Sequence, residues 1–234
     1  ADDLGDGQLI DRIKDSAKQK GTGRWASIEA LKQGVDISMI TSACTARIMS
    51  NHLDEREKAW QLIHSPAVGL SPDKESFAAM VREALYTGKI IAYAQGFSLM
   101  QDASRLYGWN LDLGKIASIF RAGCIIQAVF LNDITHAFEA EPKPESLIFD
   151  GFFLSRINEH QDSLRQAVST GVMNGLPIPA LCNAVSYLDE FRAKAAGANL
   201  IQAQRDCFGA HTYERTDHDG VFHHEWRWAN DNQH

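Results

Sequence analysis

The chain has 234 residues, of which 44% are hydrophobic and 23% are charged, and its formal net charge at pH 7 is -7. This length and composition predict a folded globular protein with one large domain or two small ones. The acidic balance argues against nucleic acid or an anionic membrane as the main partner, although a local basic pocket would still bind a small anion.

The chain carries no sign of export or of a membrane span. Its cysteines form no CxxC pair and no zinc-ligand spacing, so we expect reduced, buried thiols in a cytoplasmic protein. Residues 1–6 are acidic and do not resemble a signal peptide. The most apolar run, residues 122–132, is far shorter than the roughly 20 residues that cross a bilayer. We therefore expect a soluble protein.

A glycine-rich loop, Lys20-Gly21-Thr22-Gly23, precedes the first expected helix and is typical of a phosphate or carboxylate site. Glycines let backbone N–H groups approach a ligand, and a helix start favours negative charge. Thr22 would cap the helix or offer its hydroxyl, and Lys20 would add a positive charge. The simpler alternative is a solvated turn with a capping threonine. The loop matches no nucleotide-binding pattern, so we expect this polypeptide to bind no nucleotide cofactor by itself.

Arg47 follows the loop in a segment of small and apolar residues. An unpaired charge is costly to bury, so a buried arginine needs an anionic partner. That partner would be an internal carboxylate, which is the more common case, or a ligand phosphate held by two guanidinium hydrogen bonds.

Helical periodicity dominates the middle of the chain. A helix from Ser71-Pro72 to Gly108 would be about 50 Å long at 1.5 Å per residue. Asp112 starts a second helix that is apolar nearly all round as far as Leu131, so we expect it inside the fold or at a subunit contact. Further helices are expected near residues 155–173, 180–195 and 199–208. No convincing alternating strand is present, and we predict an all-α, multi-helical domain with long core helices.

Two more candidates for ligand binding lie near the end of the last expected helix. Arg205 precedes the end of this helix at Gly209, and His211 follows it. The simpler alternatives are an ion pair between Arg205 and Asp206 and a histidine that only ends the helix.

The last stretch, from Thr212 to His234, is rich in aromatic and charged residues, and Val221 is its one branched aliphatic side chain. Such a tail either stays disordered or docks on another surface, and its aromatic residues favour a partner subunit. His218 and His223-His224-Glu225 could bind a metal, but their spacing gives no closed ligand set, so we expect none.

Three segments resemble 6-phosphogluconate dehydrogenase: KGTGRW at 20–25, GCIIQAVFL at 123–131 and LIQAQRDCFGAHTYER at 200–215. The family joins an N-terminal Rossmann domain to a large helical domain and a tail that threads into the other subunit of a dimer. The resemblance implies that residues 1–211 are most of the helical substrate-binding and dimerisation domain, without its opening helices. Residues 212–234 would be the tail, docked on the partner subunit.

By the same resemblance, Lys20, Thr22 and Arg47 would bind the phosphate of 6-phosphogluconate. Arg205 and His211 would reach into the neighbouring subunit's site, Arg205 at the phosphate and His211 at a sugar hydroxyl or the carboxylate. The residue types favour the same phosphate site, because charge-assisted binding of a dianion requires cationic side chains and a helix start that converge on it.

The family oxidises the C3 hydroxyl by hydride transfer to NADP and then releases carbon dioxide, forming ribulose 5-phosphate in the pentose phosphate pathway. Its catalytic lysine and glutamate and its NADP-binding loop lie upstream of the matched region, so the resemblance assigns no catalytic or cofactor-binding residue here. We expect part of a cytoplasmic, homodimeric, decarboxylating dehydrogenase and an inactive isolated chain. The alternatives are a non-enzymatic helical dimerisation module that binds a sugar phosphate or nothing, and a relative that acts on another hydroxy acid.

Overall fold

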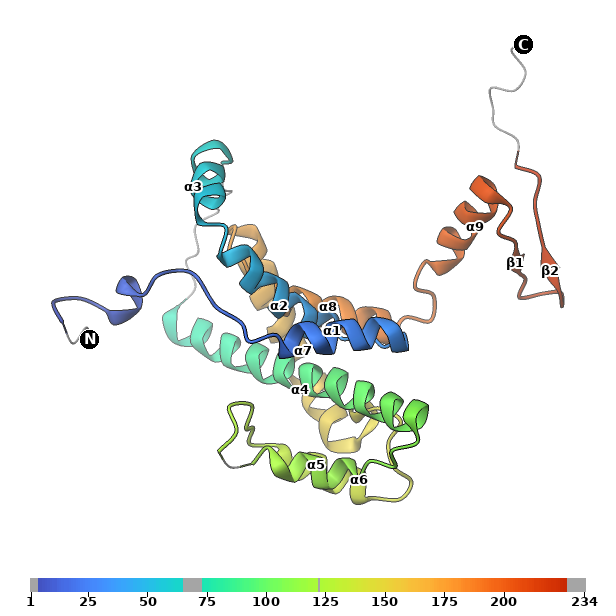
Figure 1. Ribbon diagram of the computed structural model, residues 1–234, viewed down its shortest axis with the longest axis horizontal. Coiled ribbons are helices and arrows are strands. Elements are labelled where there is room, and N and C mark those ends of the chain that lie inside the picture. Colours follow the sequence, from blue (N-terminus) through green and yellow to red (C-terminus); the bar gives the residue numbers. More distant parts are fainter. Residues whose placement is uncertain (1–3, 65–72, 122, 227–234) are drawn as a thin grey trace, which may run out of the picture. The chain divides into compact units, whose positions relative to one another are not determined.

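The computed structural model describes residues 4–64, 73–121 and 123–226, which belong to two compact units, 1–188 and 189–234. Most of the regular structure is helical, which confirms the predicted all-α class (Figure 1). No helix in the described ranges combines the length and the apolar character needed to cross a membrane. The first unit contains 3-10 turns η1 (Leu9–Arg12) and η2 (Leu147–Phe149) and the helices α1 (Thr22–Gln33), α2 (Ser38–Ser50), α3 (Leu53–Leu62), α4 (Lys74–Tyr107), α5 (Leu113–Ile119), α6 (Leu131–Glu139), α7 (Gly151–Met173) and α8 (Pro179–Arg192), the last of which runs past the unit boundary.

The long helix α4 organises the first unit. Helix α7 packs along it, and α1, α2, α5 and η2 also contact it. Its buried side chains, including Ile91 and Phe97, belong to one apolar cluster with side chains of α5, α6, α7 and α8. The Phe97 ring stacks on Phe138 of α6 with 5.3 Å between ring centroids. Because burial of apolar area contributes about 25 cal/mol per Å², this cluster is the main source of stability for the unit.

The ends of α4 lie close to those that the sequence predicts. The predicted cap and proline at residues 71–72 lie outside the described residues. The helix begins directly after Asp73, whose carboxylate accepts a hydrogen bond from Ser76 N–H at 2.9 Å. It ends before Gly108, which has a left-handed φ of 66° and terminates the helix as predicted.

The helices predicted in the last third of the chain are present as α7, α8 and α9 (Ala198–Gly209). Helix α7 begins at Gly151, earlier than the predicted start near Ser155. The reason is a cap, because the Asp150 carboxylate accepts a hydrogen bond from Phe152 N–H at 3.0 Å.

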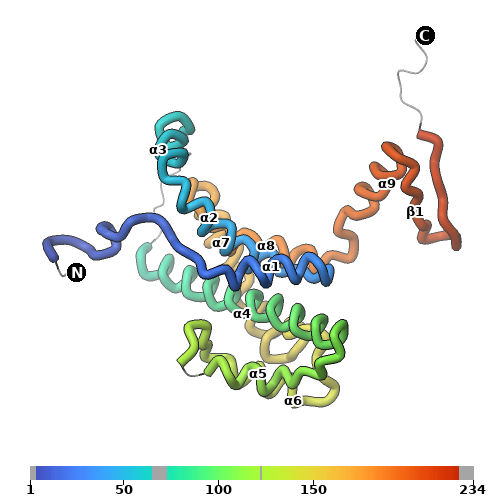
Figure 2. The backbone as a smooth tube through the Cα atoms, viewed as in Figure 1, coloured from blue at the N-terminus to red at the C-terminus, as the bar shows by residue number. Residues whose placement is uncertain are grey.

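The prediction of one apolar helix from Asp112 to Leu131 is wrong, because the chain leaves the helical conformation after Ile119. Helix α5 begins after Asp112 as predicted but ends at Ile119, and α6 begins only at Leu131. Figure 2 shows the loop that joins them, and α5 and α6 pack against each other. Two apolar side chains of this stretch, Ile125 and Val129, are 99% and 95% exposed, so they do not lie inside the fold, and the alternative of a subunit contact stays a prediction.

Backbone conformation and polar contacts explain this break. Gly123 has a left-handed φ of 69°, which no residue of a right-handed helix adopts. The Lys89 ammonium of α4 donates a hydrogen bond to the Gln127 carbonyl at 2.9 Å, and the Tyr93 hydroxyl donates to the Ile126 carbonyl. Side chains of α4 therefore satisfy carbonyl groups that helical N–H groups would otherwise satisfy, and the loop is held on α4.

The start of α2 depends on a buried amide of α4. Ile37, at the N-cap position, supplies no side-chain acceptor. The Asp36 carboxylate accepts from Ser38 N–H at 2.6 Å, and the buried Gln95 Oε1 accepts from Met39 N–H at 3.1 Å. Gln95 Nε2 also donates to Ser38 Oγ at 3.3 Å. The Gln95 amide therefore fixes where α2 begins relative to α4.

In the second unit, α9 is followed by an antiparallel hairpin of β1 (Tyr213–Glu214) and β2 (Val221–Phe222). The described part of the tail is ordered. It folds back on α9 of its own chain through hydrogen bonds to Asp206. Trp228, which contributed to the predicted aromatic tail, lies outside the described residues. Contact of the tail with a partner subunit stays a prediction.

Replacing Gln95 by Met, which has a similar length, is expected to lower the free energy of unfolding by about 1–3 kcal/mol, because Met39 N–H then loses its buried acceptor. Urea unfolding followed by circular dichroism measures this change. Gln166→Met, at an exposed position of α7, is the matched control and should change the unfolding free energy by less than about 0.5 kcal/mol. An unchanged value for the Gln95 variant would contradict the role assigned to the amide.

Candidate anion-binding site

Helix α1 begins within the glycine-rich segment, at Thr22, and has no side-chain cap. Gly21 occupies the N-cap position with a φ of 97°, a conformation that glycine adopts without strain. Thr22 is the first helical residue, so the predicted capping role of Thr22 is wrong. The N–H groups of the first turn lack acceptors within the helix, and they lie at the positive end of its dipole. This end of α1 is therefore suited to an anion.

Three of the predicted residues line one cavity of about 390 Å³. Lys20 and Thr22 come from the loop and the first turn of α1, and Arg47 comes from α2. Gly21 and Gly23, the neighbours of Thr22 in the sequence, also line the cavity. No Asp or Glu is among the described residues that line it. Two cationic side chains and an uncapped helix start thus face one space without a competing carboxylate.

Hydrogen bonds to α2 hold the segment that leads into Lys20. The N–H of Ala17 donates to Ser50 Oγ near the end of α2 at 2.9 Å. Further along, the Cys44 thiol of α2 donates to Gln19 Oε1 at 3.1 Å. The segment therefore runs along the helix that carries Arg47, which brings the two cations of the cavity together.

Arg47 is exposed, so the expectation that its charge is buried is wrong. Its neighbours in the sequence are small and apolar, but its position on α2 faces the cavity and solvent rather than the core. In the described part of the chain, no carboxylate forms an ion pair with its guanidinium group. Of the two partners considered for Arg47, an internal carboxylate is therefore not observed, and a ligand anion stays a prediction.

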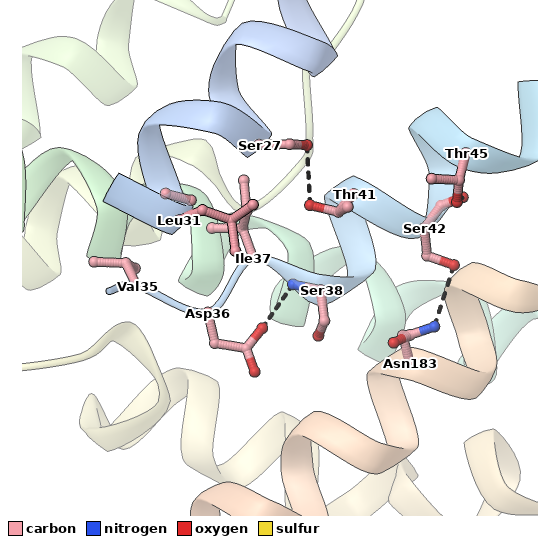
Figure 3. Close-up of a pocket in the computed structure, with 11 residues that line it drawn as sticks. Ser27, Leu31, Val35, Asp36, Ile37, Ser38, Thr41, Ser42, Thr45 and Asn183 are labelled. Carbon is pink, nitrogen blue, oxygen red and sulfur yellow. Dashed lines mark hydrogen bonds between the residues drawn. The ribbon is translucent and has the colours of Figure 1, made fainter. Parts of the chain in front are cut away.

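A second cavity, of about 450 Å³, lies between α1, α2 and α8 (Figure 3). Its polar groups bond to each other: the hydroxyls of Ser27 and Thr41 lie 2.9 Å apart, and Asn183 Nδ2 donates to Ser42 Oγ at 3.1 Å. Asp36 is the one charged side chain among the described residues that line it. A carboxylate repels an anion, so the cavity of Lys20 and Arg47 is the better candidate.

Arg205 and His211 lie in the second unit, on α9 and in the turn after it, and both are exposed. The alternative ion pair of Arg205 with Asp206 is not formed. The Arg205 guanidinium instead donates to Gln202 Oε1 at 2.9 Å, and the Asp206 side chain is fully buried. The structure thus brings Lys20, Thr22 and Arg47 together in one unit and Arg205 and His211 into one short segment of the other.

Asp206 is the residue that the sequence analysis missed. Its Oδ1 accepts hydrogen bonds from Thr212 N–H at 3.0 Å and His223 Nδ1 at 2.8 Å, and its Oδ2 accepts from His224 N–H at 3.0 Å and Trp226 Nε1 at 2.8 Å. Burial alone would raise the pKa of this carboxyl, but the hydrogen bonds hold its pKa well below the usual range. No local sequence signal marks it, because its partners lie between 6 and 20 positions further along.

The tail histidines, considered as metal ligands, are used differently in the structure. His223 contacts Asp206, and His224 packs edge-on against the Trp226 ring with 5.0 Å between ring centroids. Within the described ranges, no group of three His, Cys, Asp or Glu side chains is placed to hold a metal ion.

The chain matches the family described as 6-phosphogluconate dehydrogenase, C-terminal domain, over residues 1–226. The chain belongs to this family. The 6-phosphogluconate dehydrogenase, decarboxylating, of Lactococcus lactis subsp. lactis (strain IL1403) is 48% identical over 225 residues, which are 96% of this chain and 48% of that protein. The protein of the same description from Staphylococcus aureus (strain N315) is 47% identical over 218 residues, 93% of this chain and 47% of that protein.

A solved structure of Plasmodium falciparum 6-phosphogluconate dehydrogenase, described in its apo form and in complexes with NADP+ and 6-phosphogluconate, resembles this fold with a TM-score of 0.89 and 38% identity. The match covers 96% of this chain and 49% of that chain. The chain therefore spans about half the length of the relatives it matches. Membership of the 6-phosphogluconate dehydrogenase family confirms the resemblance inferred from the sequence motifs.

The lowered pKa of Asp206 predicts a loss of stability in acid. Its pKa in the unfolded chain is about 3.9, and its pKa in the fold is lower. The ionised carboxylate therefore stabilises the fold above about pH 4, and this contribution is lost as the pH falls towards the folded value. Between about pH 5 and pH 2, the free energy of unfolding should fall less steeply in Asp206→Asn than in the parent chain. Urea unfolding at each pH measures both slopes, and parallel slopes would contradict the assignment.

Proposed function

We propose that this chain is the substrate-binding and dimerisation part of a decarboxylating 6-phosphogluconate dehydrogenase, and that its cavity of Lys20, Thr22 and Arg47 binds the phosphate group of the substrate. One observation carries the proposal: two cations and an uncapped helix start line the same cavity, with no carboxylate among the described residues that line it. Ammonium, guanidinium and backbone N–H groups all donate charge-assisted hydrogen bonds to phosphate oxygens. Such donors would hold the phosphate end of the sugar acid.

The proposed reaction is the one that the family carries out. NADP+ would accept the hydride from C3 while the family's lysine, outside this chain, would take the hydroxyl proton. The resulting 3-keto acid would lose carbon dioxide to give an enediol, which the family's glutamate would protonate to give ribulose 5-phosphate. This chain would contribute by fixing the phosphate end, which sets the position of C3 relative to the other reactants. The pentose phosphate pathway and a cytoplasmic location are part of the same proposal.

The NADP-binding part of the enzyme would lie outside this chain. The described residues contain one two-stranded antiparallel sheet and no Rossmann domain. The catalytic lysine and glutamate of the family would also lie outside the chain. We therefore expect the isolated chain to bind substrate without oxidising it.

The second unit would complete the substrate site of a partner in a homodimer. Arg205 would contact the phosphate, and His211 would contact a sugar hydroxyl or the carboxylate. Both side chains are exposed and lie within one short segment at the end of α9, which is compatible with insertion into a neighbouring subunit. The exposed apolar side chain of Val221 on β2 offers surface for such a contact.

Arg47→Ala is expected to weaken binding of 6-phosphogluconate to the chain by about 1.5–3 kcal/mol, because a hydrogen bond between charged groups is lost. Isothermal titration calorimetry measures the affinity. Arg82→Ala removes an exposed arginine of α4 that does not line the cavity, and it should leave the affinity unchanged. If the Arg47 variant and the parent bind 6-phosphogluconate with equal affinity, the assignment of Arg47 to the phosphate is wrong. That result would favour a dimerisation module without a substrate site.

A further inference from the structure

Asp206 and Gln202, which lie about one turn apart on α9, hold the peptide groups of Thr212 from both sides. Asp206 Oδ1 accepts from Thr212 N–H at 3.0 Å, and Gln202 Nε2 donates to the Thr212 carbonyl at 2.6 Å. Thr212 has a φ of 62°, in the left-handed region that β-branched residues rarely adopt. Such a conformation persists only where surrounding contacts stabilise it. The two hydrogen bonds supply these contacts.

The held residue is adjacent to His211 and connected to Arg205. The Gln202 amide accepts from the Arg205 guanidinium at 2.9 Å through Oε1 while its Nε2 donates to Thr212. The His211 ring lies over the end of α9, where a Cβ on Gly209 would be 3.1 Å from His211 Cδ2. Gln202 therefore links the Arg205 guanidinium to the turn at Thr212, and His211 precedes Thr212 in that turn.

We propose that Asp206 is a positioning residue that orients His211 and Arg205 for the substrate through the peptide of Thr212. This inference rests on the proposed function, in which those two side chains contact 6-phosphogluconate. The Asp206 side chain is fully buried, so it would act through Thr212 and not by contact with the substrate. Its role is to keep the turn after α9 in one conformation before the substrate arrives, which lowers the entropic cost of binding.

The tail after β2 is part of the same arrangement. Asp206 Oδ2 accepts from His224 N–H and Trp226 Nε1, so the carboxylate joins the turn on one oxygen to the tail on the other. These contacts cover the carboxylate and exclude water, which strengthens its hydrogen bond to Thr212. The tail after β2 would thereby support the orientation of His211.

Asp206→Asn is the informative substitution because it preserves shape but not acceptor capacity. Each carboxylate oxygen of Asp206 accepts a backbone N–H, from Thr212 on one side and from His224 on the other. A carboxamide must place its NH₂ group against one of these donors in either orientation. The variant therefore loses either the turn contact or the tail contact, and in both orientations Thr212 N–H loses its charged acceptor.

The test is the affinity of the chain for 6-phosphogluconate, measured by isothermal titration calorimetry. Asp206→Asn should weaken binding by about tenfold or more, because misplaced binding groups lose much of their effect. Asp217→Asn is the matched control: Asp217 belongs to the same unit, pairs with Arg215 at 2.6 Å and is exposed. It should change the affinity by less than about twofold. An unchanged affinity in Asp206→Asn would overturn the proposal.

If Asp206 acts by positioning Arg205 and His211, its effect on substrate affinity should disappear when those two side chains are absent. In a chain that already carries Arg205→Ala and His211→Ala, adding Asp206→Asn should weaken binding no further. A further loss of the same size would overturn the proposal. Gln202→Met breaks the contact on the other side of Thr212 without touching the buried carboxylate, so it gives the same test if Asp206→Asn fails to fold.

Failure of the proposed function is distinguishable from failure of this inference. If the parent chain does not bind 6-phosphogluconate, or if the Arg205 and His211 substitutions leave its affinity unchanged, the proposed function is wrong. The orientation of His211 is then still measurable from the NMR signal of its ring Cε1–H. Asp206→Asn should shift this signal and Asp217→Asn should not, and an unshifted signal in Asp206→Asn would overturn the positioning role.

Discussion

The buried hydrogen bond from Met39 N–H to Gln95 is the interaction on which the arrangement of the anion cavity depends. Together with the Asp36 carboxylate, which accepts from Ser38 N–H, it satisfies the first turn of α2, and it ties that helix to α4, the centre of the first unit. Helix α2 carries Arg47, and it also binds the segment that leads into Lys20. Both cations of the cavity are therefore placed relative to one helix, and the Gln95 amide fixes the start of that helix on α4.

Much of the fold was predictable because long periodic helices depend on nearby residues. The capped and glycine-terminated helix α4 follows from such local signals. The loop between α5 and α6 did not, because the Lys89 and Tyr93 side chains of another helix compete for its carbonyl groups. The exposure of Arg47 was missed for a similar reason: apolar neighbours in sequence do not determine which face of a helix meets the core. The cluster around Asp206 joins residues too distant for any local pattern.

The candidate site shows the same division. The sequence from Lys20 to Gly23 is enough to predict an anion site, because glycines and a helix start are local features. Its convergence with Arg47 requires the fold, and the proposal that the anion is a phosphate rests on the family resemblance. In the second unit, the buried Asp206 carboxylate accepts from the backbone N–H of Thr212, next to His211. Both units thus contain a buried polar side chain that holds a backbone N–H near the exposed candidate residues.

We propose that the cavity of Lys20 and Arg47 recognises a phosphate group on a sugar acid. The most direct measurement compares the affinities of the chain for 6-phosphogluconate and for gluconate, which differ only in that group. Since each charge-assisted hydrogen bond contributes about 1.5–3 kcal/mol, 6-phosphogluconate should bind at least about tenfold more tightly. Equal affinities for the two compounds would contradict the account.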